Sequence, residues 1–291
     1  MSKCAVIVTY NPVESALKSL CNNLINENVM VILIDNSDIS KPSVVENLES
    51  EKCYVQILGE NLGIAAAQNI GIKVALSMAI DFIYLFDQDS IINQNLLESL
   101  ATPLDPNKAN VSAPVCYDEV SDSELPVQLV SSLGHIQKRF IKDLYPPYNV
   151  DLVISSGMLI TAETFNKVGL LDEDFFIDFV DFEWCFRCRS LQIPIYLVPN
   201  TKMKHSIGLG SSKILFGGSI HNPMRSYYKV RNCFLLFRKK HVPLFYSLRL
   251  LAQMYYQQFI AVISQKDKVG YLKSIILATY DGLRGTFGKK K

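Results

Sequence analysis

Short apolar runs alternate with amphipathic segments along the N-terminal part of the chain. The strand-like runs, which are rich in β-branched residues, are 4–9, 29–34, 54–58 and 81–86. The segments with helical periodicity between them are 13–26, 42–50 and 64–78. A continuous apolar run suits a strand buried on both faces, and strands that alternate with helices are typical of βαβ units. We therefore expect an α/β fold with a mostly parallel central sheet flanked by helices.

The middle of the chain is less regular. The elements expected there are strands over 152–161 and 195–198 and a helix over 182–191. Gly157 lies inside the first of these strands, where a glycine often permits close approach of backbone or ligand. Residues 117–150 are rich in Asp, Ser, Pro and Tyr, which suits a long flank of a binding site.

Amphipathic helical periodicity dominates the C-terminal part, from 223 to about Ala278. Large apolar residues lie near Arg and Lys over 243–256, a composition that suits an interfacial helix at an anionic membrane surface. The same pattern suits helices that pack on the main domain or form a homodimer, and the sequence leaves these alternatives open. We expect a catalytic domain over 1–222 and a C-terminal amphipathic helical region over 223–291.

Polar residues follow each of the four N-terminal strands at the point where the strand ends. They are Thr9-Tyr10-Asn11, Asp35-Asn36, Asn61 and Asp87-Gln88-Asp89. Ligands of parallel α/β sheets bind beyond the carboxyl ends of the strands. We therefore expect these polar side chains to converge on one crevice.

The triplet Asp87-Gln88-Asp89 places two carboxylates on a turn, so that both can point into one site. Carboxylate oxygens suit Mg²⁺ or Mn²⁺, which neutralise a diphosphate leaving group. Turn formation or helix capping is the alternative for such a triplet. The buried strand before it favours a metal site, and His205, soon after the strand over 195–198, is a candidate to complete that site with Asp89. A lone histidine is otherwise a surface or core residue.

Carboxylates alternate with aromatic and apolar residues over 178–184. A carboxylate among apolar groups tends to have a raised pKa, which suits a general base such as Asp181. The alternative is a helix start, where acids stabilise the first turn, and both hold if the base lies at the helix entrance. Ser156 and Gly157 are candidates to lie against a sugar ring. Trp184, the only tryptophan, would either stack on a pyranose or anchor the core.

Composition narrows the class of protein. Hydrophobic residues make up 49% and charged residues 20%, as in folded proteins, and the net charge of +1 gives no basis for nucleic-acid binding. The start of the chain leads directly into a strand without the apolar segment of a signal peptide, and the seven cysteines are irregularly spaced. We expect a reducing, cytoplasmic setting. No apolar run reaches about 18 residues, so we expect no transmembrane helix.

Together these motifs resemble family 2 glycosyltransferases of the GT-A fold, in particular the bacterial rhamnosyltransferases of O-antigen and capsule assembly. The residues that carry the resemblance are 8–11, 34–37, 60–63 with 67–69, 87–89, 156–157 and 176–187. The resemblance covers about 3–240. Each motif is loose, but their order and spacing are specific.

The resemblance implies a role for each matching residue. The implied donor-binding residues are Thr9, Tyr10, Asn11, Asp35, Asn36, Asn61, Gly63, Asn69, Asp87 and Gln88. Asp89 and His205 would ligate Mg²⁺ or Mn²⁺, and Asp181 would be the general base. Ser156, Gly157, Glu183 and Trp184 would bind the acceptor. One position departs from the family pattern, because Val180 stands where an acid often precedes the base; Glu183 then takes over part of the acceptor role or is itself the base.

The predicted function is that of an inverting glycosyltransferase. It would move a sugar, with L-rhamnose from dTDP-L-rhamnose favoured, to a hydroxyl of a cell-surface polysaccharide precursor. The acceptor expected is a lipid-linked oligosaccharide at the inner face of the cell membrane. The alternative is a catalytically idle sugar- or nucleotide-binding subunit of a polysaccharide assembly complex. A Rossmann-type oxidoreductase or methyltransferase is disfavoured because Thr9-Tyr10-Asn11-Pro12, rather than a GxGxxG loop, follows the first strand.

Overall fold

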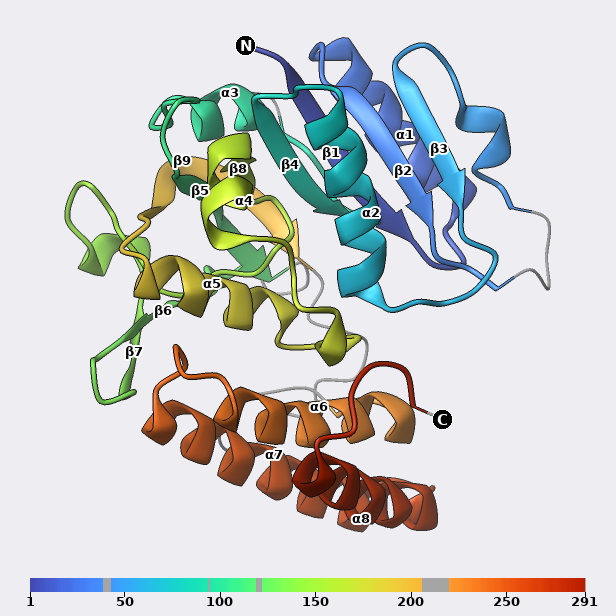
Figure 1. Ribbon diagram of the computed structural model, residues 1–291, viewed down its shortest axis with the longest axis vertical. Coiled ribbons are helices and arrows are strands. Elements are labelled where there is room, and N and C mark those ends of the chain that lie inside the picture. Colours follow the sequence, from blue (N-terminus) through green and yellow to red (C-terminus); the bar gives the residue numbers. More distant parts are fainter. Residues whose placement is uncertain (39–42, 94, 119–121, 206–219, 291) are drawn as a thin grey trace.

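The computed structural model describes residues 1–291 except 39–42, 94, 119–121, 206–219 and 291 (Figure 1). In this part of the chain one sheet has seven strands in the order β3-β2-β1-β4-β8-β5-β9. Their bounds are β1 Lys3–Thr9, β2 Met30–Asp35, β3 Cys53–Ile57, β4 Phe82–Asp87, β5 Val111–Asp118, β8 Leu159–Thr161 and β9 Ile195–His205. Neighbouring strands pair in parallel except at β8, which is antiparallel to both β4 and β5. The expected mostly parallel sheet is confirmed.

Helices cover both faces of the sheet (Figure 1). On one face lie α1 Glu14–Asn26 and α3 Leu96–Ala101, and on the other lie α2 Ile64–Ser77, α4 Ala162–Val168 and α5 Val180–Ser190. Successive side chains of a strand point to opposite faces, so Val6 of β1 packs into the core beneath α2, and Ile7 packs into the core beneath α1. This double burial explains the continuous apolar runs of the N-terminal strands.

Two sequence predictions in the sheet region were wrong. The helix expected over 42–50 is absent from the described residues 43–50, which contain only the 3-10 turn Glu46–Leu48. The Ser43 hydroxyl there donates to the carboxylate of Asp35, which ties the segment to the end of β2. The strand expected over 152–161 begins only at Leu159, because Gly157 has φ +84° and the amide of Met158 donates to the carbonyl of Ser155 in a tight turn.

The segment expected to flank the site carries a hairpin of its own. The strands β6 Val127–Val130 and β7 Ile136–Arg139 pair antiparallel, and the short helix η2 Ile141–Asp143 follows β7. A second short helix, η3 Glu173–Phe175, lies between α4 and α5. The hairpin projects from the sheet beside α5 (Figure 1).

The C-terminal helices form a separate layer (Figure 1). They are α6 Pro223–Phe237, α7 Leu244–Ser264 and α8 Lys268–Arg284, which confirms the helical periodicity expected beyond residue 222. α6 contacts both other helices and the segment that contains η3. No helix in the described ranges is long and apolar enough to cross a membrane.

Candidate active site

The carboxyl ends of β1, β2 and β4 bring the predicted polar residues together. In the parallel register Thr9 stands beside Asp35, and Val8 stands beside Asp87. This convergence follows from the register, since strands that run in the same direction end at the same edge of the sheet. The predicted crevice therefore exists, and two cavities open on it.

The first cavity, of about 170 Å³, lies at the end of β2 and is lined by Asn11, Pro12, Asp35, Ser37, Asp38, Ser43 and Val44. Asp35 is buried, and its Oδ1 accepts from the Thr9 hydroxyl at 3.0 Å and from the Ser37 hydroxyl at 2.6 Å. Ser43 donates to the other carboxylate oxygen. These donors satisfy a buried carboxylate and fix its orientation at the cavity wall.

The second cavity, of about 360 Å³, joins the sheet edge to α6. Its lining includes Val8, Thr9, Tyr10, Asn36, Asn61, Gly63, Ile64, Gln88, Phe176, Ile177, Asn222, Met224, Arg225 and Tyr228. The Asn36 amide donates to Asn61 Oδ1 at 3.1 Å, which ties the loop after β3 to the end of β2. Gln88 accepts from the Tyr10 amide at 2.7 Å and donates to its carbonyl at 3.3 Å. The side chain of Gln88 thus holds the backbone after β1 next to the backbone after β4.

Gly63 shapes the wall of this second cavity. Its φ is +90°, and a Cβ atom there would lie 2.6 Å from Phe176 Cδ2 and 2.7 Å from the Phe176 carbonyl oxygen. The Ile64 amide donates to that same carbonyl at 2.8 Å, so the backbone has little freedom to move away. Only glycine adopts this conformation without strain.

Gly63→Ala is expected to lower the free energy of unfolding by about 2–4 kcal/mol, because backbone strain and a steric clash add. Urea denaturation measures the loss. Gly288→Ala is the matched control, since Gly288 also has a positive φ (+68°) but has no neighbouring atom within 4 Å. An equal loss in both variants would show that the contact with Phe176 contributes nothing.

Asn69 lies outside both cavities. It is buried in α2, donates to the Leu171 carbonyl at 2.9 Å and to Glu173 at 2.8 Å, and accepts from the Leu171 amide at 2.9 Å. Its polar atoms are therefore occupied in holding the loop before η3. The donor contact that the resemblance implied for Asn69 has no support in this geometry.

Asp87 is the last residue of β4, and Asp89 lies two residues beyond it at the edge of the crevice. Asp87 is partly buried and Asp89 is exposed. The described residues contain no group of three or more His, Cys, Asp or Glu side chains arranged to hold a metal ion. The side chain of His205, the other predicted metal ligand beside Asp89, lies outside the described residues.

Ser156 connects the triplet to the rest of the site. Its hydroxyl lies 3.1 Å from that of Ser90 and accepts from the Asp87 amide at 3.4 Å. The Gly157 amide donates to the Leu85 carbonyl at 2.7 Å, which seats the turn against the last residues of β4. Ser156 also lines a third cavity, of about 430 Å³, between β5, the β6–β7 hairpin and Phe182.

Asp181 lies at the first turn of α5, next to Ser155 and Ser156. One carboxylate oxygen accepts from the Ser155 amide at 3.3 Å, and the other accepts from the Phe182 amide at 2.9 Å. Desolvation by burial, together with a smaller effect of the charge of Asp178, raises the pKa of Asp181 to about 6 against the opposing effect of the Phe182 and Ser155 amides. A carboxylate that titrates near neutral pH has the property required of a general base.

The loop before α5 is strained and is held by α6. Phe176, Asp178 and Phe179 all have φ between +62° and +65°, which is uncommon for residues other than glycine. The side-chain amide of Asn232 donates to the carbonyls of Phe175 at 2.9 Å, Ile177 at 2.7 Å and Asp178 at 3.0 Å. Strained backbone of this kind persists only where its surroundings fix it.

Arg231 and Arg225 hold the same loop. The fully buried guanidinium of Arg231 donates to the carbonyls of Asp174 and Phe175, both at 3.0 Å. Arg225 forms a bidentate ion pair with Asp178, with Nη2 at 3.0 Å and Nε at 3.1 Å, and it faces the second cavity. Sequence reasoning missed these residues of α6. The available signal was the pair Arg231-Asn232 inside the apolar stripe of an amphipathic helix.

Glu183 and Trp184 lie in the core, so the geometry does not support the expected acceptor contacts. Glu183 is 1% exposed and pairs with Arg187 at 3.0 Å and with the His241 ring at 2.7 Å. Trp184 is also 1% exposed; its Nε1 donates to the Gly169 carbonyl at 3.0 Å, and its ring packs against Phe165. The alternative of Glu183 as the base fails for the same reason, because a buried, paired carboxylate cannot reach an acceptor.

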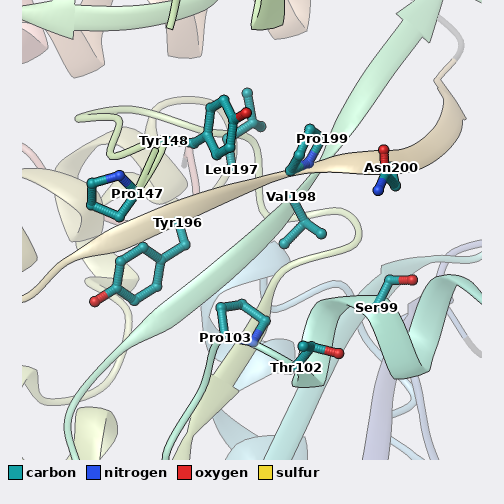
Figure 2. A pocket seen from close by; sticks show the side chains of 10 residues that line it. All are labelled: Ser99, Thr102, Pro103, Pro147, Tyr148, Tyr196, Leu197, Val198, Pro199 and Asn200. Carbon is teal, nitrogen blue, oxygen red and sulfur yellow. The ribbon is translucent and has the colours of Figure 1, made fainter. Parts of the chain in front are cut away.

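A further cavity, of about 510 Å³, lies away from this crevice (Figure 2). Figure 2 shows Tyr196, Leu197 and Val198 from the first half of β9 lining it, with Ser99, Thr102 and Pro103 at the end of α3. None of the predicted site residues lines it, and it contains no Asp, Glu, His, Lys or Arg side chain.

Comparison with known proteins agrees with this geometry. Residues 4–169 match the family model described as Glycosyl transferase family 2. The chain is 39% identical over 286 residues to the dTDP-rhamnosyl transferase RfbF of Shigella flexneri, which covers 98% of this chain and 96% of that protein.

Solved structures with the same fold include GalNAc-T7 with UDP, GalNAc and Mn²⁺, at a TM-score of 0.62 and 17% identity, and residues 1–349 of S. aureus TarS in complex with UDP-GlcNAc, at 0.55 and 15%. Both alignments cover 98% of this chain; the chain spans 58% of the GalNAc-T7 structure and 82% of the TarS structure. At this identity the likeness shows the fold, which is that of GT-A glycosyltransferases. Because the family model covers more than half of the chain and RfbF matches nearly all of it, this chain belongs to glycosyl transferase family 2.

Proposed function

We propose that this glycosyltransferase is an inverting rhamnosyltransferase with dTDP-L-rhamnose as its donor. The observation that carries the proposal is a carboxylate with a raised pKa, Asp181, joined through Ser155-Ser156 to the nucleotide-facing edge of the sheet. The relation to an enzyme named dTDP-rhamnosyl transferase supports the choice of sugar. The catalytic domain is then 1–222, and α6 of the helical region 223–291 completes its donor cavity.

The donor would occupy the two cavities at the ends of β1 and β2. The nucleobase of the donor would enter the smaller cavity, beside Asp35 and Asn11. Its ribose and diphosphate would lie in the larger cavity, which is bordered by Asn36, Asn61 and Gly63. The edge between the two cavities would be formed by Thr9, Tyr10, Gln88 and Asp87. The guanidinium of Arg225 adds a cation to the larger cavity, where it complements a diphosphate.

A divalent metal is part of the proposal. The exposed carboxylate of Asp89 and the nearby carboxylate of Asp87 are oxygen ligands of the type that Mg²⁺ and Mn²⁺ prefer. We assign the metal to Asp89 with His205, and the related GalNAc-T7 structure contains Mn²⁺. A bound metal would neutralise charge on the departing diphosphate.

Asp181 would remove the proton from an acceptor hydroxyl. The acceptor oxygen forms its bond to the anomeric carbon on the face opposite the diphosphate, and the bond from that carbon to the diphosphate oxygen breaks, so the configuration inverts. Burial keeps the pKa of Asp181 near 6, which leaves the carboxylate ionised and still basic at neutral pH. The other candidate function, a catalytically idle binding subunit, would not require a carboxylate with a raised pKa.

The acceptor would enter beside Ser156 and Gly157, where the third cavity meets Phe182. We propose a lipid-linked oligosaccharide as the acceptor and a location at the inner face of the cell membrane. A membrane surface and a second copy of the chain are the two candidate partners of the helical layer.

A panel of nucleotide sugars tests the donor. In the presence of Mn²⁺, dTDP-L-rhamnose at about 100 times its Kd is expected to raise Tm by roughly 5 °C, because binding adds about 2.7 kcal/mol to stability. dTDP-glucose, UDP-GlcNAc and GDP-mannose serve as controls. An equal rise with dTDP-glucose would show that only the nucleotide is recognised, and a flat response to every donor would contradict the proposal.

A further inference from the structure

α8 has two apolar faces, and only one of them is covered. Tyr271, Ser274, Ala278 and Gly282 are buried against the other helices. On the opposite side Val269, Leu272, Ile276, Tyr280 and Leu283 are between 49% and 66% exposed. Their spacing of three or four residues places them in one stripe along the helix. A surface helix with one partner normally turns charged residues to solvent on this side, so the stripe indicates a second partner.

α7 carries a parallel feature. Its buried side includes Tyr246, Leu250, Met254 and Ala261, whereas Leu248, Phe259 and Ile263 on the other side are between 46% and 61% exposed. Phe259 and Ile263 are one turn apart near the C-terminal end of the helix, and Leu248 lies on the same side near its N-terminal end. Phe245 instead stacks against His135 of the β6–β7 hairpin, with the ring centroids 6.2 Å apart. α7 and α8 pack on each other, and both lie on the side of α6 away from the sheet (Figure 1). We call the exposed stripes of α7 and α8 together the outer face.

Cations outnumber acids in the helices that form the outer face. Residues 244–284, which span α7 and α8, contain five Lys and Arg residues and two acids, Asp267 and Asp281. Asp267 caps α8 through the Gly270 amide at 2.9 Å, and Asp281 lies toward α6, where it accepts from the Tyr227 hydroxyl at 2.6 Å. The cations include Lys266, Lys268 and Lys273, which are exposed beside the stripe.

We propose that the outer face binds the surface of an anionic lipid bilayer. Large apolar side chains rimmed by lysine and arginine complement the acyl boundary and the anionic headgroups of such a surface. A second copy of the chain fits less well, because a two-fold interface would bring two basic rims together. No helix of the described ranges is long and apolar enough to cross a bilayer.

The arrangement places the reaction close to that surface. α6 lies between the outer face and the donor cavity, to which it contributes Arg225 and Tyr228. Two layers of helices, each about 10 Å across, therefore lie between the membrane surface and the donor cavity. The inference deepens the proposed function, on which it rests only for the lipid-linked nature of the acceptor.

Vesicle binding of the full chain tests the proposal. The experiment uses the full chain, because Arg231, which holds the loop before α5, also donates to the Gly288 carbonyl. Removal of the C-terminal residues would therefore disturb that loop. Flotation uses phosphatidylcholine vesicles with and without phosphatidylglycerol. We expect binding to the anionic vesicles that weakens with salt. The double variants Leu272→Glu with Ile276→Glu, and Lys266→Glu with Lys273→Glu, should each reduce the bound-to-free ratio ~10-fold or more.

Leu191→Glu is the matched control, because Leu191 is 52% exposed but lies at the end of α5, away from the outer face. It should bind vesicles as the native chain does. Donor-induced Tm shifts and transfer to a water-soluble acceptor should be unchanged in every variant, so a failed vesicle experiment leaves the proposed enzyme intact. The proposal would be overturned if the native protein did not bind anionic vesicles, or if the double variant Leu272→Glu with Ile276→Glu still bound them. So would a solution dimer that these variants convert to monomers by light scattering, since the outer face would then be a homodimer interface.

Discussion

Asp181→Asn is expected to lower turnover by ~10²–10⁴-fold while donor binding stays nearly unchanged. The amide keeps the shape of the side chain but cannot take a proton from the acceptor hydroxyl. The donor cavities are lined by other residues, so their affinity should persist. Steady-state transfer to acceptor, together with calorimetric titration of donor, measures the two quantities separately.

The pH dependence of the native enzyme provides a second readout of the same residue. Because burial raises the pKa of Asp181 to about 6, turnover should fall about tenfold per pH unit below 6 and level off above it. The raised pKa also has a consequence for stability: the folded state holds this proton more tightly than the unfolded chain, whose carboxyl titrates near 3.8. The contribution of the group to stability therefore decreases as pH rises from about 4 to about 6.

Asp181→Asn should not show the loss of turnover at low pH that protonation of Asp181 causes. It should also not show the decrease in stability between about pH 4 and about pH 6. At pH 8 it should be at least as stable as the native chain, which would locate its defect in the chemistry. Asp105→Asn, which changes a partly exposed carboxylate in the turn before β5, is the control and should keep native turnover. Full activity of Asp181→Asn would remove Asp181 from the role of base.

Asn232→Ala is expected to lower the free energy of unfolding by about 3–5 kcal/mol. The two hydrogens of the Asn232 side-chain amide are shared among three backbone carbonyls, and its oxygen accepts from Arg231 at 2.8 Å and 3.0 Å. Each buried group left without a partner costs about 1–3 kcal/mol. Urea denaturation followed by circular dichroism measures the change.

The same variant should affect catalysis in the molecules that remain folded. The carbonyls concerned belong to the strained loop that leads into Asp181, so loss of the tether lets that loop relax. Asn93→Ala is the matched control, since exposed Asn93 makes a single bond to the Lys202 carbonyl and should cost no more than about 1 kcal/mol. If both variants lose the same stability, α6 does not hold the loop through Asn232.

The local pattern of the sequence was sufficient for the sheet and for the edge at which the site lies. Continuous β-branched runs predicted parallel strands, and parallel strands end at one edge, so Thr9, Asp35 and Asp87 had to meet. The motifs of the resemblance lie along this edge and led to the correct family. These properties depend on neighbouring residues and on strand direction, both of which can be inferred from the sequence alone.

Contacts between distant segments decided the rest. Asn69, Glu183 and Trp184 match family motifs, yet partners 15 to 104 residues away hold them in the core. In the sequence, Arg231 and Asn232 are only a polar interruption of an amphipathic helix. Their function becomes evident in the fold, which places the carbonyls of the loop before α5 beside them.

The same holds for the two apolar faces of α7 and α8. Periodicity identified these segments as helices, because the spacing of side chains around a helix is a local property. Which stripe is buried depends on where the other helices lie, and only the packing of α6, α7 and α8 shows that a whole apolar face remains uncovered. The sequence by itself thus determined the elements and the edge that carries the chemistry. The tertiary structure determined which side chains reach that edge and which face is left for a partner, because burial and pairing arise between residues that are far apart in the chain.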